Sequence, residues 1–188
     1  MPGSLRGEMR AFVGIPLPED LSDRFEDLAS GLRLGRAVPA ENMHVTLAFL
    51  DDQPEEVLAE LHEALSAMTL PQPEIAIEGL DLFGGAKPRL LFASVTAHEA
   101  LTELRRKVRQ AVQRVGITLP HERFRPHVTL RRFNRLAPFE RDELERFLTL
   151  QGGFQWPGFR PEACQMVESL LTQEGAQYEV LASYPLSK

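Results

Sequence analysis

Two identical tetrapeptides, His-Val-Thr-Leu, occur at residues 44–47 and 127–130. Because side chains alternate between the two faces of a strand, each histidine shares a face with the threonine two positions later, while the valine and leucine face an apolar core. One such motif is typical of an ordinary half-exposed strand. The same uncommon choice made twice indicates a single site shared by two strands, with His44, Thr46, His127 and Thr129 as its polar groups.

Two facing histidines could carry out general acid–base catalysis. An imidazole titrates near neutral pH, so one ring can accept a proton from an attacking hydroxyl or water while the other donates to a leaving oxygen. Each threonine hydroxyl, on Thr46 and on Thr129, could donate to a non-bridging phosphate oxygen. The pattern predicts in-line transfer at a phosphodiester, and we expect it to require neither a metal ion nor an organic cofactor.

The elements that would position these residues alternate along the chain. We expect strands at residues 10–15, 44–50, 74–83, 89–96, 127–133, 165–171 and 178–183, and helices at residues 19–34, 54–68, 98–115 and 140–150. Hairpins occur among the crossovers, which favours a mixed or antiparallel α+β fold over a doubly wound parallel sheet. The length of 188 residues suits one domain spanning residues 1–188.

Charge is distributed unevenly along the chain. The net charge of −6 at pH 7 argues against a generally basic surface that coats nucleic acid. Residues 105–135, however, hold ten Arg or Lys and a single acid, Glu122, a local balance of +9. This segment predicts a basic zone that faces a phosphate or a polyanion, although a solvated helix face followed by a loop would explain the charge equally well.

Cysteine content and hydropathy indicate the compartment. A single cysteine, Cys164, excludes an internal disulfide framework. The first apolar stretch, residues 11–15, is too brief for a signal sequence or a membrane span. We therefore expect a cytoplasmic protein without membrane contact.

The residues around the two tetrapeptides resemble the two signatures of the two-histidine phosphoesterase superfamily. These segments are residues 39–50 and 124–130, and the likeness extends to residues 10–17, 88–92, 168–171 and 175–180. Within the superfamily, the chain is most similar to the bacterial and archaeal RNA 2′,3′-cyclic phosphodiesterases, first known as 2′-5′ RNA ligases. It departs from their pattern at Asp51-Asp52, where relatives usually have a glycine, and at Phe92, where many have tryptophan.

The resemblance implies a bilobed α+β fold with a pseudo-two-fold relation, in which each lobe contributes one His-x-Thr strand to a shared cleft. It implies hydrolysis of a 2′,3′-cyclic phosphate at an RNA end to a 2′-phosphomonoester, and the same groups could run 2′-5′ ligation in reverse. His44 would be the acid that protonates the departing 3′ oxygen and His127 the base that activates water. Thr46 and Thr129 would hold phosphate oxygens. The two motifs are chemically equivalent, so the sequence alone leaves the polarity of the histidines open.

The family often has an arginine five residues after the second histidine, which here is Arg132, and the resemblance implies that it contacts phosphate. Strict alternation places Arg131 instead on the face of His127 and Thr129, and Arg132 reaches that face only if the strand bulges or ends. Both arginines therefore stay candidates. Spacing favours core positions for three phenylalanines that could otherwise stack on a base: Phe49, Phe92 and Phe133.

Two other functions stay open. A noncatalytic module could bind RNA through the basic zone, although the intact pair of motifs argues against it. A phosphodiesterase of the same superfamily could act on a small cyclic nucleotide or an ADP-ribose cyclic phosphate, but the +9 segment favours an RNA end. No heptad run indicates an obligate protein partner, so we expect a monomer that binds RNA with a 2′,3′-cyclic phosphate terminus, such as a tRNA fragment.

Overall fold

A computed structural model describes residues 7–173 and 175–188 and arranges them as one sheet with helices on its outer sides. The helices are α1 (Glu19–Ser30), α2 (Glu55–Ser66), α3 (Glu99–Arg114), α4 (Pro138–Gln151) and the short 3-10 helix η1 (Ala40–Asn42). The strands are β1 (Met9–Pro16), β2 (Arg36–Ala37), β3 (His44–Gln53), β4 (Leu70–Pro71), β5 (Ile75–Phe83), β6 (Leu90–Val95), β7 (His127–Arg132), β8 (Gln155–Phe159), β9 (Ala163–Thr172) and β10 (Gly175–Ser187). The α+β class predicted from the sequence is confirmed.

The sheet is symmetric about its centre. Its order is β4-β10-β9-β1-β3-β7-β6-β5-β8, and β2 pairs with β7 beside this path. The central pair is β3 with β7; β1 and β6 flank it, followed by β9 and β5, and these pairs are antiparallel. The order thus contains two lobes related by a pseudo-two-fold axis that passes between β3 and β7, as the sequence resemblance predicts.

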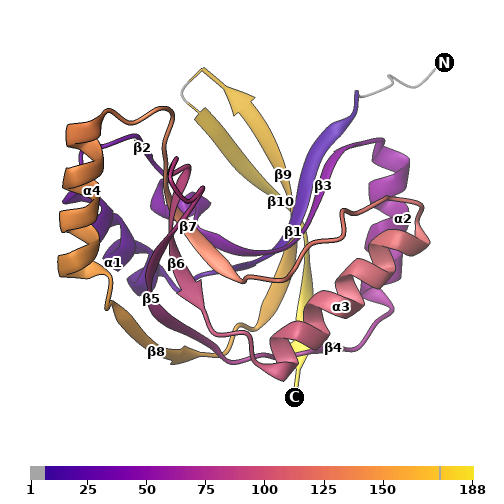
Figure 1. Ribbon diagram of the computed structural model, residues 1–188. Coiled ribbons are helices and arrows are strands. Elements are labelled where there is room, and N and C mark those ends of the chain that lie inside the picture. The colour runs from indigo at the N-terminus through magenta and orange to yellow at the C-terminus, as the bar shows by residue number, and fades with distance from the viewer. Residues whose placement is uncertain (1–6, 174) are drawn as a thin grey trace.

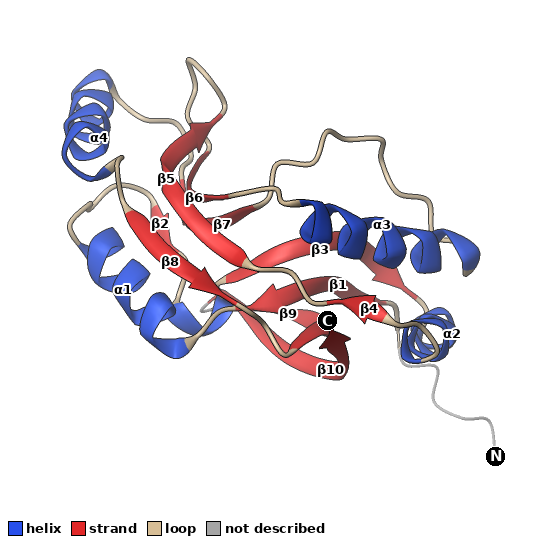
Figure 2. Ribbon diagram, turned by 90° about the horizontal axis from the view of Figure 1, so that it is seen from below, coloured by secondary structure: helices blue, strands red, loops and turns tan. Residues whose placement is uncertain are grey.

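The helices cross from one lobe to the other. Helix α1 lies in the connection from β1 to β3, which also contains β2 and η1, but it packs on β7 and β2. Helix α3 connects β6 to β7 but packs on β3 and β4. Helices α1 and α4 therefore lie on one side of the molecule and α2 and α3 on the other, with the β9–β10 hairpin rising between them (Figures 1 and 2). Each lobe is therefore covered in part by a helix that connects strands of the other lobe.

The helices form because apolar residues recur at three- and four-residue spacing. In α3 the buried residues are Leu101, Leu104, Val108, Ala111 and Val112, which pack toward the sheet while the basic residues lie on the remaining surface. In the central strands the inward residues Val45 and Val128 are fully buried. Burial of these apolar faces is the main force that fixes the two tetrapeptide strands against each other.

Three short strands, β2, β4 and β8, lack the alternating pattern on which a strand prediction depends. Strand β8 contains Pro157 and Gly158 and lies at the edge of the sheet, where a proline removes no ladder hydrogen bond. Strand β10 is also longer than predicted, at Gly175–Ser187. In the described part of the chain, no helix has the length and apolar character needed to span a membrane.

Candidate active site

The two tetrapeptides begin the central strands β3 and β7, which pair antiparallel where Val45 lies opposite Val128. Both valines point into the core, and the histidine and threonine of each motif are half-buried on the opposite face. The antiparallel direction places each histidine beside the threonine of the other motif, because the flanking positions are exchanged across the pair. The predicted alternation within both motifs is confirmed.

The ring of His44 is held by four contacts. Its Nδ1–H donates to the carbonyl oxygen of Asn42 at 2.9 Å, and the hydroxyl of Thr46 lies 2.9 Å from its Nε2. The ring stacks on Phe12 with centroids 4.3 Å apart, and Tyr178 contacts it edge-on at 5.5 Å. Since a carbonyl can only accept a hydrogen bond, the neutral ring keeps its lone pair on Nε2, where the Thr46 hydroxyl donates to it.

His127 is held in the same way by different residues. Its Nδ1–H donates to the carbonyl oxygen of Arg125 at 2.7 Å, again two residues before the histidine. Phe83 and Phe92 contact the ring edge-on, with centroids 5.0 Å and 5.3 Å away. Both neutral imidazoles therefore have the tautomer with the lone pair on Nε2, the nitrogen that can exchange a proton.

Burial lowers the pKa of both histidines. The pKa of His44 falls to about 4, chiefly through burial, and the nearby charge of Arg132 lowers it further. The pKa of His127 is also lowered by burial, and then by the charges of Arg125 and Arg132. The hydrogen bond from each ring to its backbone carbonyl acts in the opposite direction. A bound phosphate anion would favour the imidazolium form of either ring.

A β-bulge at the last residue of the second tetrapeptide places the two candidate arginines on opposite faces of β7. Along β6, Leu91 pairs with Arg131 and Phe92 pairs with Thr129, so Leu130 is an extra residue in β7. The bulge returns Arg132 to the face of the second motif, where it is exposed and lines a cavity together with His44 and Thr129. The sequence predicts that Arg132 reaches this face only if the strand bulges or ends, and the strand does bulge.

Arg131 points away from the site. Its side chain is buried, and its guanidinium donates to the carbonyl oxygens of Leu34 at 2.7 Å, Ala29 at 2.9 Å and Gly35 at 3.3 Å. These bonds attach β7 to the segment that follows α1. The prediction of Arg131 as a phosphate contact is therefore wrong, because its donors are engaged by the backbone of another element.

A matching bulge lies at the last residue of the first motif. Val13 pairs with Ala48 and Gly14 with Thr46, which leaves Leu47 as the extra residue in β3. Phe49 is consequently returned to the face of His44 and is 61% exposed. The core position predicted for Phe49 is wrong, whereas the same prediction is confirmed for two other phenylalanines, Phe92 and Phe133.

Asp51 explains one departure from the family pattern. Its φ of 55° lies in the left-handed region, which glycine adopts without strain and which aspartate tolerates better than most residues. The backbone of β3 therefore keeps, with an aspartate, the conformation that glycine favours. Asp51 also contributes a carboxylate to the rim of a cavity beside His127.

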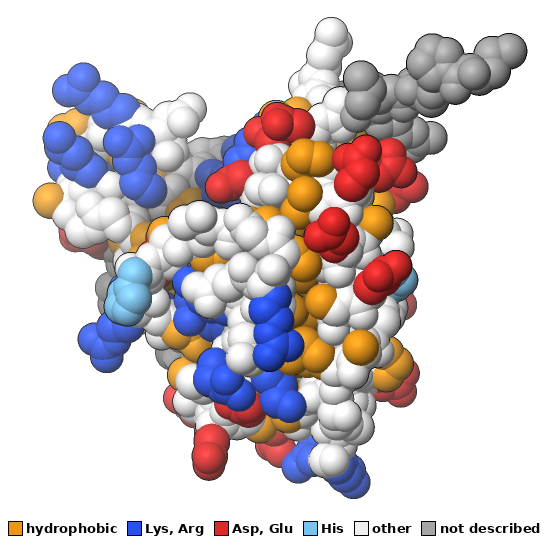
Figure 3. All heavy atoms as spheres, turned by 90° about the vertical axis from the view of Figure 1, so that its right-hand side faces the viewer, with side chains coloured by type: hydrophobic (Ala, Val, Ile, Leu, Met, Phe, Trp, Pro, Cys, Tyr) orange, Lys and Arg blue, Asp and Glu red, His pale blue; other side chains and the backbone are white. Residues whose placement is uncertain are grey.

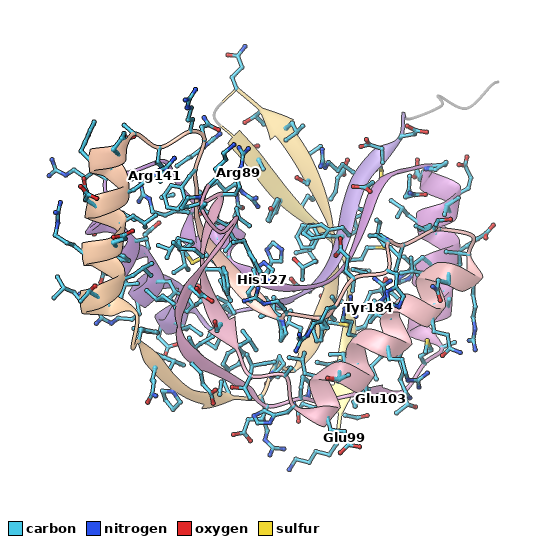
Figure 4. The ribbon with its side chains drawn as sticks, in the orientation of Figure 1. Arg89, Glu99, Glu103, His127, Arg141 and Tyr184 are labelled. Carbon is cyan, nitrogen blue, oxygen red and sulfur yellow. The ribbon has the colours of Figure 1, made fainter. Side chains whose placement is uncertain are left out.

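Two cavities adjoin the histidines, one on each side. The first, which we call the His44 cavity, measures about 320 Å³ and is lined by His44, Thr129 and Arg132, by the segment 36–42 and by the β9–β10 hairpin. The second, the His127 cavity, measures about 620 Å³ and is lined by His127 and Thr46, by parts of β1, β3 and α3, and by the loop 119–125. Figure 4 shows His127 near the middle of the molecule, between the two groups of helices.

Comparison with known proteins identifies the family. A family model described as the 2′-5′ RNA ligase superfamily matches residues 17–173. This chain belongs to the 2′-5′ RNA ligase superfamily. In solved structures, E. coli LigT complexed with 3′-AMP matches with a TM-score of 0.80 at 21% identity, over 96% of this chain and 99% of that chain, which shows a common fold.

Two relatives within the superfamily carry the name RNA 2′,3′-cyclic phosphodiesterase. The protein from Geobacillus stearothermophilus is 32% identical over 183 residues, which make up 93% of this chain and 56% of that relative. This chain thus spans little more than half the length of that relative. The protein from Archaeoglobus fulgidus is 29% identical over 178 residues, or 92% of this chain and 98% of that relative.

Several residues of the site belong to elements that the sequence does not connect with the motifs. Phe12, Phe83 and Tyr178 support the two imidazoles from β1, β5 and β10. Phe12 lies in an apolar run of the sequence. That position predicts that Phe12 is buried but does not reveal that it contacts His44. Among the described residues, no group of three or more His, Cys, Asp or Glu side chains is placed to hold a metal ion.

Proposed function

We propose that this protein hydrolyses 2′,3′-cyclic phosphates at RNA ends to 2′-phosphomonoesters. The observation that carries the proposal is the antiparallel contact of the two His-x-Thr strands at Val45 and Val128. This contact gathers two imidazoles and two hydroxyls on one polar face of an otherwise apolar pair of strands. The relatives named RNA 2′,3′-cyclic phosphodiesterase, matched over more than nine-tenths of this chain, support the substrate class.

The proposed reaction is an in-line displacement at phosphorus. Nε2 of His127 accepts a proton from water, whose oxygen attacks the phosphorus as the bond to the 3′ oxygen breaks. Nε2–H of His44 donates its proton to that departing oxygen, which becomes the 3′ hydroxyl, and the phosphate stays on the 2′ oxygen. This polarity follows the family resemblance. The carbonyl bonds to both Nδ1 atoms leave Nε2 as the exchanging atom of each ring, whichever histidine is the acid.

The remaining polar groups have roles in holding phosphate. The hydroxyls of Thr46 and Thr129 donate to the two non-bridging oxygens, and Arg132 balances the negative charge that develops on them. In the free protein the Thr46 hydroxyl lies on Nε2 of His44. When it turns to the phosphate it releases that nitrogen, while the anion stabilises the imidazolium that His44 needs as an acid.

The proposal is tested by incubating the protein, in excess EDTA, with a short RNA that ends in a 2′,3′-cyclic phosphate. We expect conversion to the 2′-phosphate, separated from the 3′-phosphate by chromatography. His44→Ala and His127→Ala should each lower turnover by a factor on the order of 10²–10⁴. His98→Ala is the matched control, because His98 is exposed at the start of α3.

Three results would contradict the proposal. They are no conversion by the folded wild-type protein, a loss of less than about tenfold in either histidine variant, and loss of activity in EDTA that a divalent metal restores. RNA binding without conversion of any cyclic phosphate would instead favour a noncatalytic module.

A further inference from the structure

The residue two positions before each histidine makes contacts in two directions. Its backbone carbonyl accepts from the Nδ1–H of the histidine, at 2.9 Å between Asn42 and His44 and at 2.7 Å between Arg125 and His127. A carbonyl needs no particular side chain to accept this bond. Both side chains, however, reach a strand that lies nearer the edge of the same lobe, β10 for Asn42 and β5 for Arg125. Their roles therefore need a separate explanation.

The side chain of Asn42 is attached to the β9–β10 hairpin. Its Nδ2 donates to the carbonyl oxygen of Ala176 at 2.7 Å, although the two residues are 134 positions apart. Asn42 is only 8% exposed, and a buried amide is costly unless it is hydrogen-bonded. The same strand contributes Tyr178, whose ring contacts His44 edge-on at 5.5 Å. Strand β10 thus holds His44 twice, directly through Tyr178 and indirectly through the carbonyl of Asn42.

The side chain of Arg125 makes the corresponding contact in the other lobe. Its guanidinium lies 4.7 Å from the centroid of the Phe83 ring and 3.6 Å from the carboxylate of Asp81, and both partners belong to β5. Phe83 in turn contacts the ring of His127 edge-on, with centroids 5.0 Å apart. Strand β5 therefore also holds its histidine twice, directly through Phe83 and indirectly through the carbonyl of Arg125.

The repetition is informative because the two side chains have little chemistry in common. Asn42 offers a buried neutral amide that donates a hydrogen bond, whereas Arg125 offers a half-exposed cation that lies over an aromatic ring. Both connections nonetheless start two residues before a motif histidine and end on the strand whose aromatic ring contacts that histidine. The two places share one requirement, an imidazole whose Nε2 is aimed at the phosphorus.

We propose that Asn42 and Arg125 are positioning residues of the reaction, each of which joins the carbonyl that holds its histidine to a strand nearer the edge of the lobe. The proposal rests on the proposed function. In-line displacement needs one Nε2 on the side of the water and the other on the side of the departing oxygen, and a displacement of about 1 Å can cost a factor on the order of 10² in rate. Neither side chain exchanges a proton in this reaction.

Steady-state kinetics on an RNA that ends in a 2′,3′-cyclic phosphate test the proposal. Asn42→Leu keeps the shape of the side chain but removes the donor to Ala176, and Arg125→Met removes the cation over Phe83. Each should lower kcat about tenfold and leave KM within about twofold, because the lost contact orients a catalytic group and does not bind substrate. Arg125→Lys should recover most of the loss, since lysine keeps a cation over the ring.

Matched controls separate positioning from general stability and charge. Gln72→Met removes a side-chain amide that donates to the carbonyl oxygen of Pro161 at 3.0 Å, a bond of the same kind that lies outside both cavities. Arg160→Met removes an arginine that is paired with Glu74 at 3.2 Å and is about as exposed as Arg125. A charge control is needed because Lys and Arg side chains gather at several places on one face of the molecule (Figure 3). Both controls should keep the wild-type kcat.

Proton NMR of the free protein measures the positioning without any substrate. The Nδ1–H protons of His44 and His127 are assigned by their absence in His44→Ala and His127→Ala. Because each is bonded to a carbonyl oxygen, we expect both to exchange slowly with water in the wild-type protein. In Asn42→Leu the His44 proton should exchange several-fold faster while the His127 proton is unchanged, and Arg125→Met should have the reverse effect.

Each outcome decides the proposal. Unchanged kcat and unchanged exchange in both variants would overturn it, and so would a higher KM at constant kcat, which would mean that these side chains bind substrate. An equal loss in Gln72→Met and Arg160→Met would also overturn it. Because Arg125 is half-exposed, its variants decide the question even where Asn42→Leu does not fold. A wild-type protein that hydrolyses no cyclic phosphate would contradict the proposed function, whereas the Nδ1–H exchange would still decide the positioning, so the two failures are distinguishable.

Discussion

Each catalytic candidate is oriented by the backbone immediately before it. A carbonyl two residues earlier, from Asn42 for His44 and from Arg125 for His127, accepts from Nδ1–H. This local geometry repeats because the two strands begin alike, and it requires no side chain that a sequence motif would reveal. The motif therefore indicates the histidines, whereas their tautomer follows from the chain direction at the start of each strand.

The lowered pKa values predict the pH dependence of the reaction. The productive form has one protonated and one neutral imidazole, and in the free protein both pKa values lie below the usual 6.5 or so, with His44 at about 4. The singly protonated pair is therefore most abundant on the acid side of pH 6.5. We expect kcat/KM, which reports the free protein, to peak there.

The same measurement separates the bound state from the free state. A bound phosphate anion raises the pKa of a nearby imidazole, so kcat should peak at a higher pH than kcat/KM. Steady-state rates between pH 4 and 9 test both statements. A kcat/KM that climbs to a plateau above pH 7 would contradict the burial-lowered pKa values.

Gly14 predicts a positioning effect on His44. A methyl group added at Gly14 would lie 3.1 Å from the carbonyl oxygen of Val45 and 3.2 Å from the His44 ring, closer than side chains normally approach. We expect Gly14→Ala to displace the ring by a few tenths of an ångström and to lower kcat about tenfold, with little change in KM. Gly153→Ala is the control, since nothing lies within 4 Å of the added group. Unchanged kcat in Gly14→Ala would show that the ring tolerates the displacement.

At the scale of the elements, the alternation of strands and helices is predictable from the sequence, and the deviations have identifiable causes. The long helices and the motif strands bury an apolar face at regular spacing, as in α3 and β7. Strand β8 is missed by the sequence-based prediction because it contains Pro157, which argues against a strand but is tolerated at the edge of a sheet. The bulges cannot be predicted by counting every second residue, because that count assumes that no residue is inserted. This explains why the predicted phosphate contact of Arg131 and the predicted core position of Phe49 are wrong.

The bulge in β7 predicts opposite effects for two adjacent arginines. Arg131→Met leaves the carbonyl oxygens of Leu34, Ala29 and Gly35 without their buried donor. We expect a loss of about 2–4 kcal/mol in the free energy of unfolding. Arg132→Met changes an exposed side chain in the His44 cavity and should leave stability within about 0.5 kcal/mol while lowering kcat/KM.

Urea unfolding of the two variants, together with their steady-state rates, tests this division. The matched substitution controls for the loss of one positive charge, because both variants replace arginine by the same unbranched residue. Equal stability in the two variants would mean that the buried carbonyl oxygens find other donors. Full activity in Arg132→Met would remove this residue from the proposed phosphate contacts.

At the scale of the whole molecule, the basic segment predicted from composition separates into several environments. Arg105, Arg109 and Arg123 line the His127 cavity, whereas Arg132 lines the His44 cavity. Arg131 is buried, and Arg106 is ion-paired on the outer face of α3. Composition thus predicts that the charge near the site is positive. It cannot predict which arginines line a cavity, which are buried and which are ion-paired, because this depends on the fold of α3, the following loop and the bulge.

The crossed helices predict that the two lobes unfold together. Because α1 packs on the strands of the second lobe and α3 on those of the first, neither lobe can lose its structure without exposing apolar surface of the other. We expect one calorimetric transition whose van't Hoff and calorimetric enthalpies agree. Leu61→Ala, in α2, and Leu144→Ala, in α4, remove buried side chains from opposite sides of the molecule.

Both substitutions should therefore lower the midpoint of the same transition. A buried leucine replaced by alanine costs about 2–5 kcal/mol, which corresponds to a shift of roughly 5–15 °C for a chain of this size. Scanning calorimetry of the wild-type protein and the two variants tests this directly. Two resolved transitions, each moved by one substitution alone, would show that the lobes are separate folding units despite the exchange of helices. A single transition that both substitutions move is the result that the crossed connections require, and it would establish the two motif strands as parts of one cooperative unit.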